Sequence, residues 1–250
     1  MGRPLDGKVA LVTGAGKNIG RAIALHLARD GAAVIVNGRS DAAALDAVVE
    51  EIAASGGNAM PAIADVSDQG AVARMVADAA GRLGGVDIVV SNAGLRRQTP
   101  FLDISLDEWR EILSVALDGA FIVAQAAVPH MIRRGGGAIV ALSGISTHVG
   151  TPNRCHVSAS KAGLEGLMRA LAIELAPHGI TANCVAPGSV DTVRGAAAGV
   201  RPSSLGDRTI PLQRKATVDD IAGLVRHLVG PEGAYITGQT IHVNGGLFLT

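Results

Sequence analysis

Short apolar runs alternate with longer segments of helical spacing along the chain. The short runs are rich in valine, isoleucine and alanine and predict strands, whereas apolar residues three and four positions apart predict helices. The predicted strands cover residues 9–13, 34–36, 59–64, 86–90, 138–142, 181–185 and 240–243. The predicted helices cover residues 19–30, 42–54, 69–83, 106–133 with a break near 117–119, a segment that starts one turn before Lys161 and runs to 179, and 218–229.

This alternation indicates the fold class. Strands that alternate with helices form a parallel sheet with right-handed crossovers and helices on both faces. The chain has 250 residues, which suits one large α/β domain with a sizeable core. We therefore expect a single domain over residues 1–250, with a Rossmann-like, doubly wound parallel sheet of about seven strands.

One stretch, residues 188–217, lacks clear periodicity and is rich in Gly, Ser, Pro and Arg. It follows the carboxyl end of a predicted strand, which is where open α/β sheets bind ligands. Long loops in compact domains are more often functional than accidental. We expect a substrate loop that acts as a lid, the alternative being a variable surface excursion.

Charge and composition exclude several classes of protein. The formal net charge is zero, which gives no reason to expect nucleic acid or an acidic membrane surface as a partner. Cys155 and Cys184 are too few and too isolated for a disulfide framework or a zinc site, and no other metal site is indicated. The chain goes straight into a strand without a basic and apolar leader, and no apolar run reaches the ~20 residues that span a bilayer. We expect a cytoplasmic protein.

The segment TGAGKNIG, residues 13–20, joins the first predicted strand to the first helix. A helix N-terminus preceded by a glycine-rich loop offers free backbone amides and a positive dipole to a pyrophosphate. Asn18 interrupts the glycines, and asparagine tolerates left-handed backbone conformations better than most residues. We therefore expect the turn to keep its shape.

Several motifs together resemble the short-chain dehydrogenase/reductase family. Lys161 follows a run of small residues and precedes an amphipathic helix, as in the family's Tyr-x-x-x-Lys signature. The loop at 13–20 is similar to the family's Thr-Gly-x-x-x-Gly-x-Gly, with Asn18 in place of the middle glycine. Further similar segments are SNAG at 91–94, PGSVDT at 187–192 and YITGQTIHVNGG at 235–246. The resemblance covers nearly the whole chain.

The resemblance implies a nicotinamide cofactor and assigns residues to it. In the family Asp65 would contact the adenine, and Val190 and Thr192 would lie near the carboxamide. The residues assigned to the cofactor are Gly14, Lys17, Asn18, Ile19, Gly20, Arg39, Asp65, Val66, Asn92, Ala93, Gly94, Lys161, Pro187, Gly188, Val190 and Thr192.

The end of the second strand distinguishes the two nicotinamide cofactors. An acidic residue there would bind the ribose hydroxyls of NAD and repel a 2′-phosphate, but residues 36–39 read Val-Asn-Gly-Arg. Arg39 can bind a phosphate with two hydrogen bonds, and Lys17 adds a second positive charge. We expect NADP(H) rather than NAD(H), the alternative being two solvated surface charges.

The catalytic residues that the family uses are not found at their positions. Val157 stands for the tyrosine, Gly144 for the serine and Ala116 for the asparagine, so that only Lys161 remains. The sole tyrosine of the chain is Tyr235. Valine, glycine and alanine side chains donate no proton, and the loss of a general acid costs roughly 10²–10⁴-fold in rate. Carbonyl reduction by the usual mechanism is expected to be slow or absent.

Other side chains could supply the proton. His148 follows Gly144 on the segment that lines the substrate pocket in the family, and histidine titrates near neutral pH. A bound water is a second candidate, and Lys161 is a third if burial lowers its pKa. We assign His156 mostly to packing, because one helical step turns it by about 100° from the tyrosine position.

Two arginines, Arg96 and Arg97, follow the SNAG segment after one leucine. In the family this place lies at the rim of the cleft, where paired arginines would suit an anionic substrate. The alternative is that they are ordinary surface charges.

Two functions follow from these observations. One is an NADP(H)-dependent oxidoreductase with a non-standard proton donor that acts on a small carbonyl, hydroxy or conjugated substrate. If Arg96 and Arg97 bind the substrate, we expect it to be anionic. The alternative is an inactive NADP(H)-binding sensor or partner subunit. The resemblance also implies a homodimer or homotetramer that pairs through the Lys161 helix and the helix before it.

Overall fold

The computed structural model describes residues 2–193 and 209–249. Within this part of the chain, seven strands form one sheet in the order β3-β2-β1-β4-β5-β6-β7, and every neighbouring pair is parallel. The strands are β1 (Val9–Val12), β2 (Ala33–Gly38), β3 (Asn58–Ile63), β4 (Ile88–Ser91), β5 (Gly137–Leu142), β6 (Ile180–Pro187) and β7 (Thr240–Val243). The predicted doubly wound sheet is confirmed.

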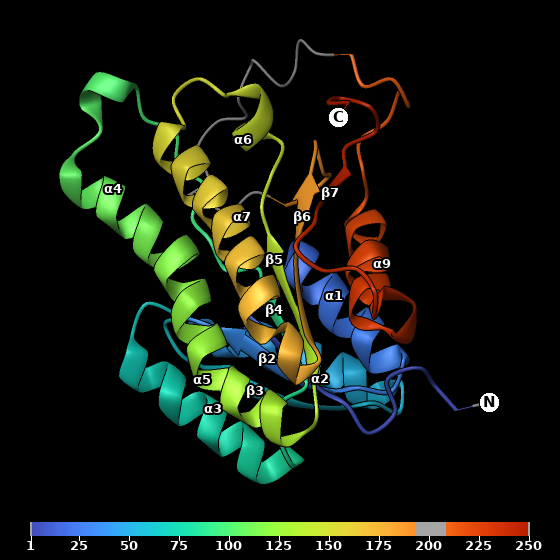
Figure 1. Cartoon of the computed structure of the whole chain (residues 1–250). Coiled ribbons are helices and arrows are strands. Elements are labelled where there is room, and N and C mark those ends of the chain that lie inside the picture. Colours follow the sequence, from blue (N-terminus) through green and yellow to red (C-terminus); the bar gives the residue numbers. More distant parts are fainter. Residues whose placement is uncertain (1, 194–208, 250) are drawn as a thin grey trace.

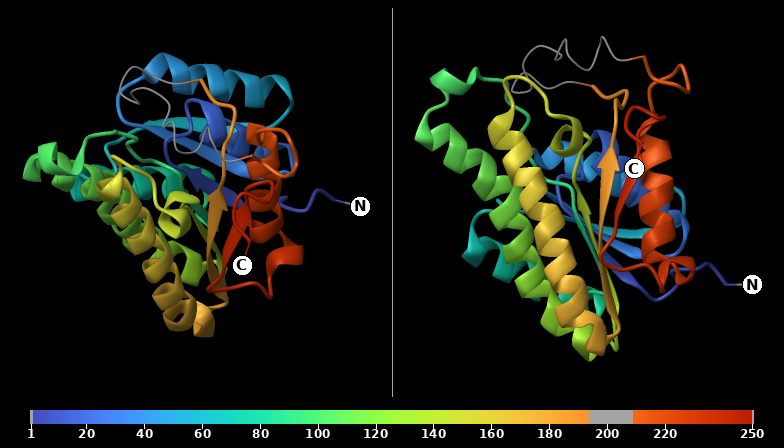
Figure 2. Two further views of the ribbon diagram at one scale, coloured as in Figure 1. Left: turned by 90° about the horizontal axis from the view of Figure 1, so that it is seen from above. Right: turned by 45° about the horizontal axis from the view of Figure 1, so that its top comes forward.

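Helices cover both faces of the sheet (Figures 1 and 2). One layer contains α1 (Asn18–Arg29), α2 (Ala42–Ala54) and α9 (Val218–Val229), and the other contains α3 (Gln69–Leu83), α5 (Gly119–Arg133) and α7 (Cys155–Leu175). The strand period of two divides each strand between two cores. On β1, Ala10 and Val12 pack with the first layer, and Val9 and Leu11 pack with the second.

The long helical stretch 106–133 is interrupted at 114–118, which overlaps the predicted break near 117–119, but the kind of interruption was not predicted. It consists of α4 (Leu106–Leu113), a π-helical turn at Ser114–Asp118, and α5. The helix axis continues through this turn, so the interruption is a bulge and not a gap. Such bulges occur frequently at functional sites, and Ala116 lies inside this one.

The segment around Lys161 also differs from the prediction. Helix α7 begins at Cys155, so Lys161 lies nearly two turns into it and not one. A short helix that the prediction missed, α6 (Ser146–Val149), precedes it. Four residues are too few to show helical periodicity in a sequence.

The ends of the irregular stretch lie side by side. Val190 forms a parallel bridge with Ala216. Two backbone hydrogen bonds flank it, from Asp191 N to Ala216 O (2.8 Å) and from Ala216 N to Ser189 O (2.9 Å). The central part of the predicted lid, 194–208, lies outside the described residues.

Helices α4 and α5 bear on the expectation about membranes. By length and composition, the run Leu106–Arg133 could cross a bilayer, contrary to the expectation that no apolar run is long enough. Part of this run packs inside the fold, because α5 lies against α3 and β4 and α4 lies against α7, whereas Leu106 and Phe121 are exposed. One such helix is weak evidence for a membrane span.

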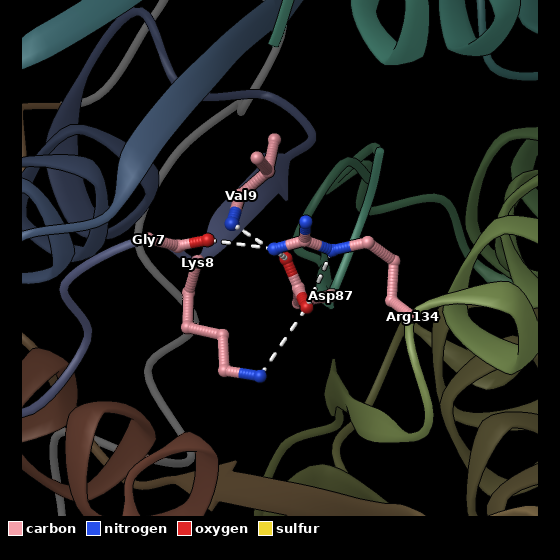
Figure 3. A network of polar contacts seen from close by, with 5 residues as sticks. All are labelled: Gly7, Lys8, Val9, Asp87 and Arg134. Carbon is pink, nitrogen blue, oxygen red and sulfur yellow. Dashed lines mark hydrogen bonds and ion pairs between the residues drawn. The ribbon is translucent and has the colours of Figure 1, made fainter. Parts of the chain in front are cut away.

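A buried carboxylate joins three segments at the amino end of the sheet (Figure 3). Asp87 accepts hydrogen bonds from the Val9 backbone (2.9 Å), from Lys8 Nζ (3.3 Å) and from Arg134 Nε and Nη2 (3.1 and 3.0 Å). Arg134 Nη2 also donates to the carbonyl of Gly7 at 2.6 Å. This network lies at the amino ends of β1 and β4, whereas the glycine-rich loop follows the carboxyl end of β1.

Candidate functional site

The residues assigned to a cofactor follow the carboxyl ends of the strands. Strand β1 lies next to β4 in the sheet, and the helices that follow these two strands lie on opposite faces, α1 in one layer and α5 in the other. This is the topological switch point at which open α/β sheets bind their ligands. The end of the sheet in question points upward in Figure 1.

The glycine-rich loop is bonded to the segment after β4. Asn92 Nδ2 donates to the carbonyls of Thr13 and Gly14, both at 3.0 Å. Thr13 Oγ1 accepts from the backbone N–H groups of Asn92 and Ala93, also at 3.0 Å. A Cβ on Gly20 would lie 2.3 Å from Gly14 O, so this position admits only glycine. Thr13 was not among the predicted site residues, although its place between the strand and the first glycine marks it.

Asn18 has the conformation that the sequence predicted, with φ = 52°. It is the first residue of α1, whose N-cap Lys17 makes no side-chain capping hydrogen bond. The first turn of α1 contains no acidic residue. The backbone amides at this helix end and its positive dipole therefore remain available to a pyrophosphate.

The end of β2 presents a positive charge. Asn37 is buried and donates through Nδ2 to the carbonyls of Ala62 and Ala64, both at 3.1 Å, so its side chain is held inside the sheet. Arg39 is exposed. Burial raises the pKa of Asp65, but hydrogen bonds from Ser67 and the charge of Arg39 outweigh this and lower the pKa overall. Arg39 and Asp65 therefore lie close enough to interact at the predicted adenosine end.

Lys161, Gly94 and Ala116 lie together. Lys161 Nζ donates to the carbonyl of Leu142 at 2.6 Å. A Cβ on Gly94 would lie 3.5 Å from Lys161 Nζ and 3.9 Å from the Ala116 Cβ. Burial, and after it the charge of Arg96, lowers the pKa of Lys161 to about 8, while Cys184 acts in the opposite direction. No carboxylate within the described ranges forms an ion pair with this ammonium group.

The turn after β5 is held by Glu165, a buried residue that sequence analysis missed. One oxygen of its carboxylate, Oε1, lies 2.6 Å from Ser143 Oγ, 3.1 Å from Thr147 Oγ1 and 3.0 Å from His148 Nε2. Its spacing of four residues from Lys161 would place it on the same side of α7. That spacing was the available signal, but a glutamate on a helix is usually exposed.

His148 thus has a defined environment. Besides its contact with Glu165, the imidazole stacks on Phe248 at 5.2 Å between ring centroids, and it meets the edge of His242 at 4.5 Å. The pKa of His242 is lowered by burial and by His148, with Glu165 opposing. These contacts fix the His148 ring between α7, β7 and the C-terminal segment.

The two arginines after β4 differ in their surroundings. Arg97 Nη1 donates to Glu111 at 2.5 Å, and this contact raises the pKa of Arg97. Its charge is therefore used within the protein. Arg96 acts on Lys161, so it is the member of the pair closer to the candidate site.

His156, which precedes Val157, faces away from this site. It is fully buried, and its Nε2 lies 3.0 Å from Glu108 Oε1. The same oxygen accepts from Thr99 Oγ1 at 2.6 Å. The prediction that His156 serves packing fits this arrangement.

The remaining cofactor candidates lie near the same edge. Gly188 packs so closely on the C-terminal segment that a Cβ would lie 2.7 Å from Asn244 Cα, and the Pro187 carbonyl accepts from Ile145 N at 3.0 Å. Val66 is buried and packs against Gly119. Ile19 is buried in the core under α1.

The arrangement matches that of known proteins. A family described as Enoyl-(Acyl carrier protein) reductase matches residues 14–248. The 3-oxoacyl-[acyl-carrier-protein] reductase FabG of Staphylococcus aureus strain Mu50 is 40% identical over 244 residues, which cover 97% of this chain and 98% of the relative. The 3-oxoacyl-[acyl-carrier-protein] reductase of Synechocystis is 37% identical over 246 residues, 98% of each chain.

Two solved structures extend the comparison. A short chain dehydrogenase from Burkholderia cenocepacia in complex with NADP is 38% identical, with a TM-score of 0.89 over 98% of this chain and 99% of the other. A blue fluorescent protein from a metagenomic library in complex with NADPH is 36% identical, with a TM-score of 0.91 over 98% of this chain and all of the other. Together with the sheet order and the glycine-rich loop, these matches establish that the chain belongs to the short-chain dehydrogenase/reductase family.

Proposed function

We propose that this protein is an NADP(H)-dependent oxidoreductase that reduces a small carbonyl or conjugated substrate, with Lys161 in place of a tyrosine as the proton donor. The observation that carries the proposal is the state of Lys161. Its ammonium group is desolvated beside Gly94 and Ala116, and its pKa is lowered to about 8. A general acid works best when its pKa lies near the working pH.

NADP(H) is the cofactor that the residues fit. The free amides of α1, the close packing at Gly20 and the exposed Arg39 suit a pyrophosphate and a 2′-phosphate. Relatives of 36–38% identity carry NADPH or NADP in their structures. When bound, NADPH supplies a hydride to the substrate.

The protein's own residues supply the proton and orient the substrate. As a C–H bond forms at the substrate carbon, the carbonyl oxygen gains negative charge. Lys161 gives this oxygen a proton, directly or through a water, and the neutral amine regains one from solvent. Val157 is a buried hydrocarbon side chain and takes no part in this transfer.

The substrate class follows from the relatives and from one charge. The relatives' names point to 3-oxoacyl and enoyl thioesters of an acyl carrier protein. We propose a 3-oxoacyl or enoyl thioester as the substrate, and Arg96 provides positive charge near Lys161 for an anionic group of such a molecule.

The test is an assay of NADPH oxidation with a panel of 3-oxoacyl thioesters, enoyl thioesters and simple ketones. Lys161→Met should abolish turnover, whereas His148→Asn should reduce it less than tenfold, since His148 is held by Glu165. Loss of turnover in the His148 variant alone would make His148 the donor. The alternative function is an inactive NADP(H)-binding sensor or partner subunit. It would be supported if the protein bound NADPH tightly without turnover and gained activity when Val157→Tyr, Gly144→Ser and Ala116→Asn were combined.

We propose further that the protein is a homo-oligomer. Large apolar side chains are exposed on the α4 and α5 region and on α7, namely Phe101, Leu102, Leu106, Phe121 and Ile173. Exposed apolar side chains grouped on neighbouring elements are typical of subunit interfaces. Sedimentation should give a mass of two or four chains.

A further inference from the structure

The turn after β5 carries several hydroxyl groups, and most of them are engaged. Ser143 Oγ donates to Glu165 at 2.6 Å. Thr147 Oγ1 donates to the Gly144 carbonyl at 2.9 Å and also lies 3.1 Å from Glu165. These two hydroxyls hold the turn in shape and cannot also bind a substrate in this conformation.

Ser146 is different. Its hydroxyl makes no hydrogen bond with any residue in the described ranges 2–193 and 209–249, and the side chain is partly exposed. Among the described residues, the space on the side-chain face of Gly144 is otherwise open. A Cβ built on Gly144 would have one described neighbour within 4 Å, the Ser146 Oγ at 3.8 Å.

We propose that the Ser146 hydroxyl orients the carbonyl group of the substrate. It lies next to the place that a side chain at position 144 would occupy. The inference rests on the proposed function, since it concerns how the same site binds its substrate. A serine Oγ lies about 1.4 Å from its Cβ, so the Ser146 hydroxyl lies within a few ångströms of where the hydroxyl of a serine introduced at position 144 would be. The two hydroxyls can therefore address the same carbonyl oxygen.

The proposed role of Ser146 is to donate a hydrogen bond to the substrate's carbonyl oxygen. A hydroxyl donates one hydrogen bond to the carbonyl oxygen, and the bond strengthens as the oxygen becomes negative. It transfers no proton, so it complements Lys161 rather than replacing it. Removal of one such donor typically reduces kcat by roughly a hundredfold to a thousandfold.

Glu165 is the positioning residue for this hydroxyl. It binds the side chains of Ser143, Thr147 and His148, which lie before and after Ser146 in the chain. Ser146 is the first residue of α6, and its own carbonyl accepts from Ser158 Oγ at 3.4 Å. The turn is thus fixed at several points around the Ser146 hydroxyl.

The experiment uses Ser146→Ala, with Ser55→Ala as the control and the double variant Ser146→Ala/Gly144→Ser as a rescue. Ser55 is exposed at the end of α2, and its hydroxyl donates to the carbonyls of Glu51 and Ile52. The probe is an acetoacetyl thioester of N-acetylcysteamine labelled with ¹³C at the ketone. Its carbonyl stretch is recorded by isotope-edited infrared spectroscopy in the complex with NADP⁺, where no reduction can occur. The kcat/KM for the same thioester with NADPH is measured in parallel, together with the Kd of NADPH.

We expect a carbonyl band at lower frequency than in water for the unchanged protein and for Ser55→Ala. In Ser146→Ala the band should return toward the water value, and kcat/KM should fall at least tenfold with the Kd of NADPH unchanged. Adding Gly144→Ser should restore both. An unchanged band and kcat/KM in Ser146→Ala would overturn the inference.

The same measurements distinguish a failure of the proposed oxidoreductase function from a failure of the Ser146 proposal. If the band shift depends on Ser146 but no variant or substrate gives turnover, Ser146 still binds the carbonyl and the protein is a binding protein. If the unchanged protein neither shifts the band nor reduces the thioester, both proposals are wrong for this substrate class.

Discussion

Asn18 and Val193 are joined by two hydrogen bonds between elements far apart in the sequence. Asn18 Nδ2 donates to the Val193 carbonyl at 2.9 Å, and Asn18 Oδ1 accepts from the Val193 N–H at 3.0 Å. Asn18 belongs to the glycine-rich loop after β1, and Val193 follows β6. A glycine at position 18 would allow the same backbone but could not form this link. The side chain therefore ties the start of the predicted substrate loop to the predicted pyrophosphate site.

Asn18→Gly should weaken NADPH binding without unfolding the protein. Glycine accepts φ = 52° without strain, so the turn should be kept while both hydrogen bonds are lost. Partly exposed neutral hydrogen bonds are worth about 0.5–1 kcal/mol each, which corresponds to a Kd for NADPH raised by about 5–30-fold. Stopped-flow fluorescence should show that the change lies mainly in a faster dissociation rate.

The control for this substitution is Asn153→Gly. Asn153 is also an asparagine with positive φ, 60°, and its backbone carbonyl accepts from Thr99. It is remote in sequence from the glycine-rich loop, and glycine keeps its backbone hydrogen bond. If both variants weakened NADPH binding equally, the link between Asn18 and Val193 would have no special role.

Lys161 should give the reaction a characteristic pH dependence. Because its pKa is lowered to about 8 and the protonated form is the acid, kcat/KM for reduction should fall as the pH rises above about 8. The expected slope is one decade per pH unit. A profile measured from pH 6 to 10, with NADPH saturating, tests this, and a fall that began only near pH 10 would exclude Lys161 as the donor.

Local patterns in the sequence predicted most of the fold because the periodic elements are regular. The bounds of α2, α3, α9 and β7 agree with prediction to the residue. The alternation of strands and helices limits the possible strand orders, since right-handed crossovers leave few topologies, but it does not select one of them. Failures occurred where structure depends on distant contacts, as at the π-helical turn Ser114–Asp118 and at α6.

In the candidate site, features that depend on one residue type were predictable, and features that depend on distant contacts were not. The left-handed conformation of Asn18 followed from the chemistry of asparagine. The role of Glu165 did not, because a glutamate on a helix carries no sign of the three side chains that fold onto it. The contact of Arg97 with Glu111 likewise joins residues fourteen positions apart and has no sign in the local sequence.

Glu165 should be important for stability. It is 5% exposed and binds two hydroxyls and an imidazole. Glu165→Leu would leave those polar groups unpaired in the interior, at a cost of about 2–4 kcal/mol in the free energy of unfolding. Glu174→Gln, at an exposed site on the same helix, should change it by less than about 0.5 kcal/mol. Urea unfolding compares the two, and similar small effects would mean that the network contributes little.

Arg39 should determine the preference for NADPH over NADH. A guanidinium group that pairs with a 2′-phosphate contributes about 1.5–3 kcal/mol through charged hydrogen bonds. Arg39→Ala should therefore raise the Kd of NADPH about tenfold to a hundredfold and leave that of NADH nearly unchanged. Arg29→Ala, an exposed arginine at the end of α1, is the control. Equal losses for both nucleotides would show that Arg39 does not contact the phosphate.

Arg134 and Lys8 both bind Asp87, but their removal should have unequal effects. The Asp87 side chain is 1% exposed, and Arg134 gives it two hydrogen bonds while Lys8 gives one at 3.3 Å from a side chain that is 46% exposed. Arg134→Ala would leave a buried carboxylate short of partners and should cost about 2–4 kcal/mol. Lys8→Ala should cost at most about 1 kcal/mol, because an exposed lysine is solvated in both states. Since Lys8 and Asp87 precede β1 and β4, whereas the glycine-rich loop follows β1, the Kd of NADPH should be the same in both variants. Urea unfolding and NADPH titration of the two proteins decide this, and a Lys8 variant as unstable as the Arg134 variant would show that the number of hydrogen bonds is not what matters.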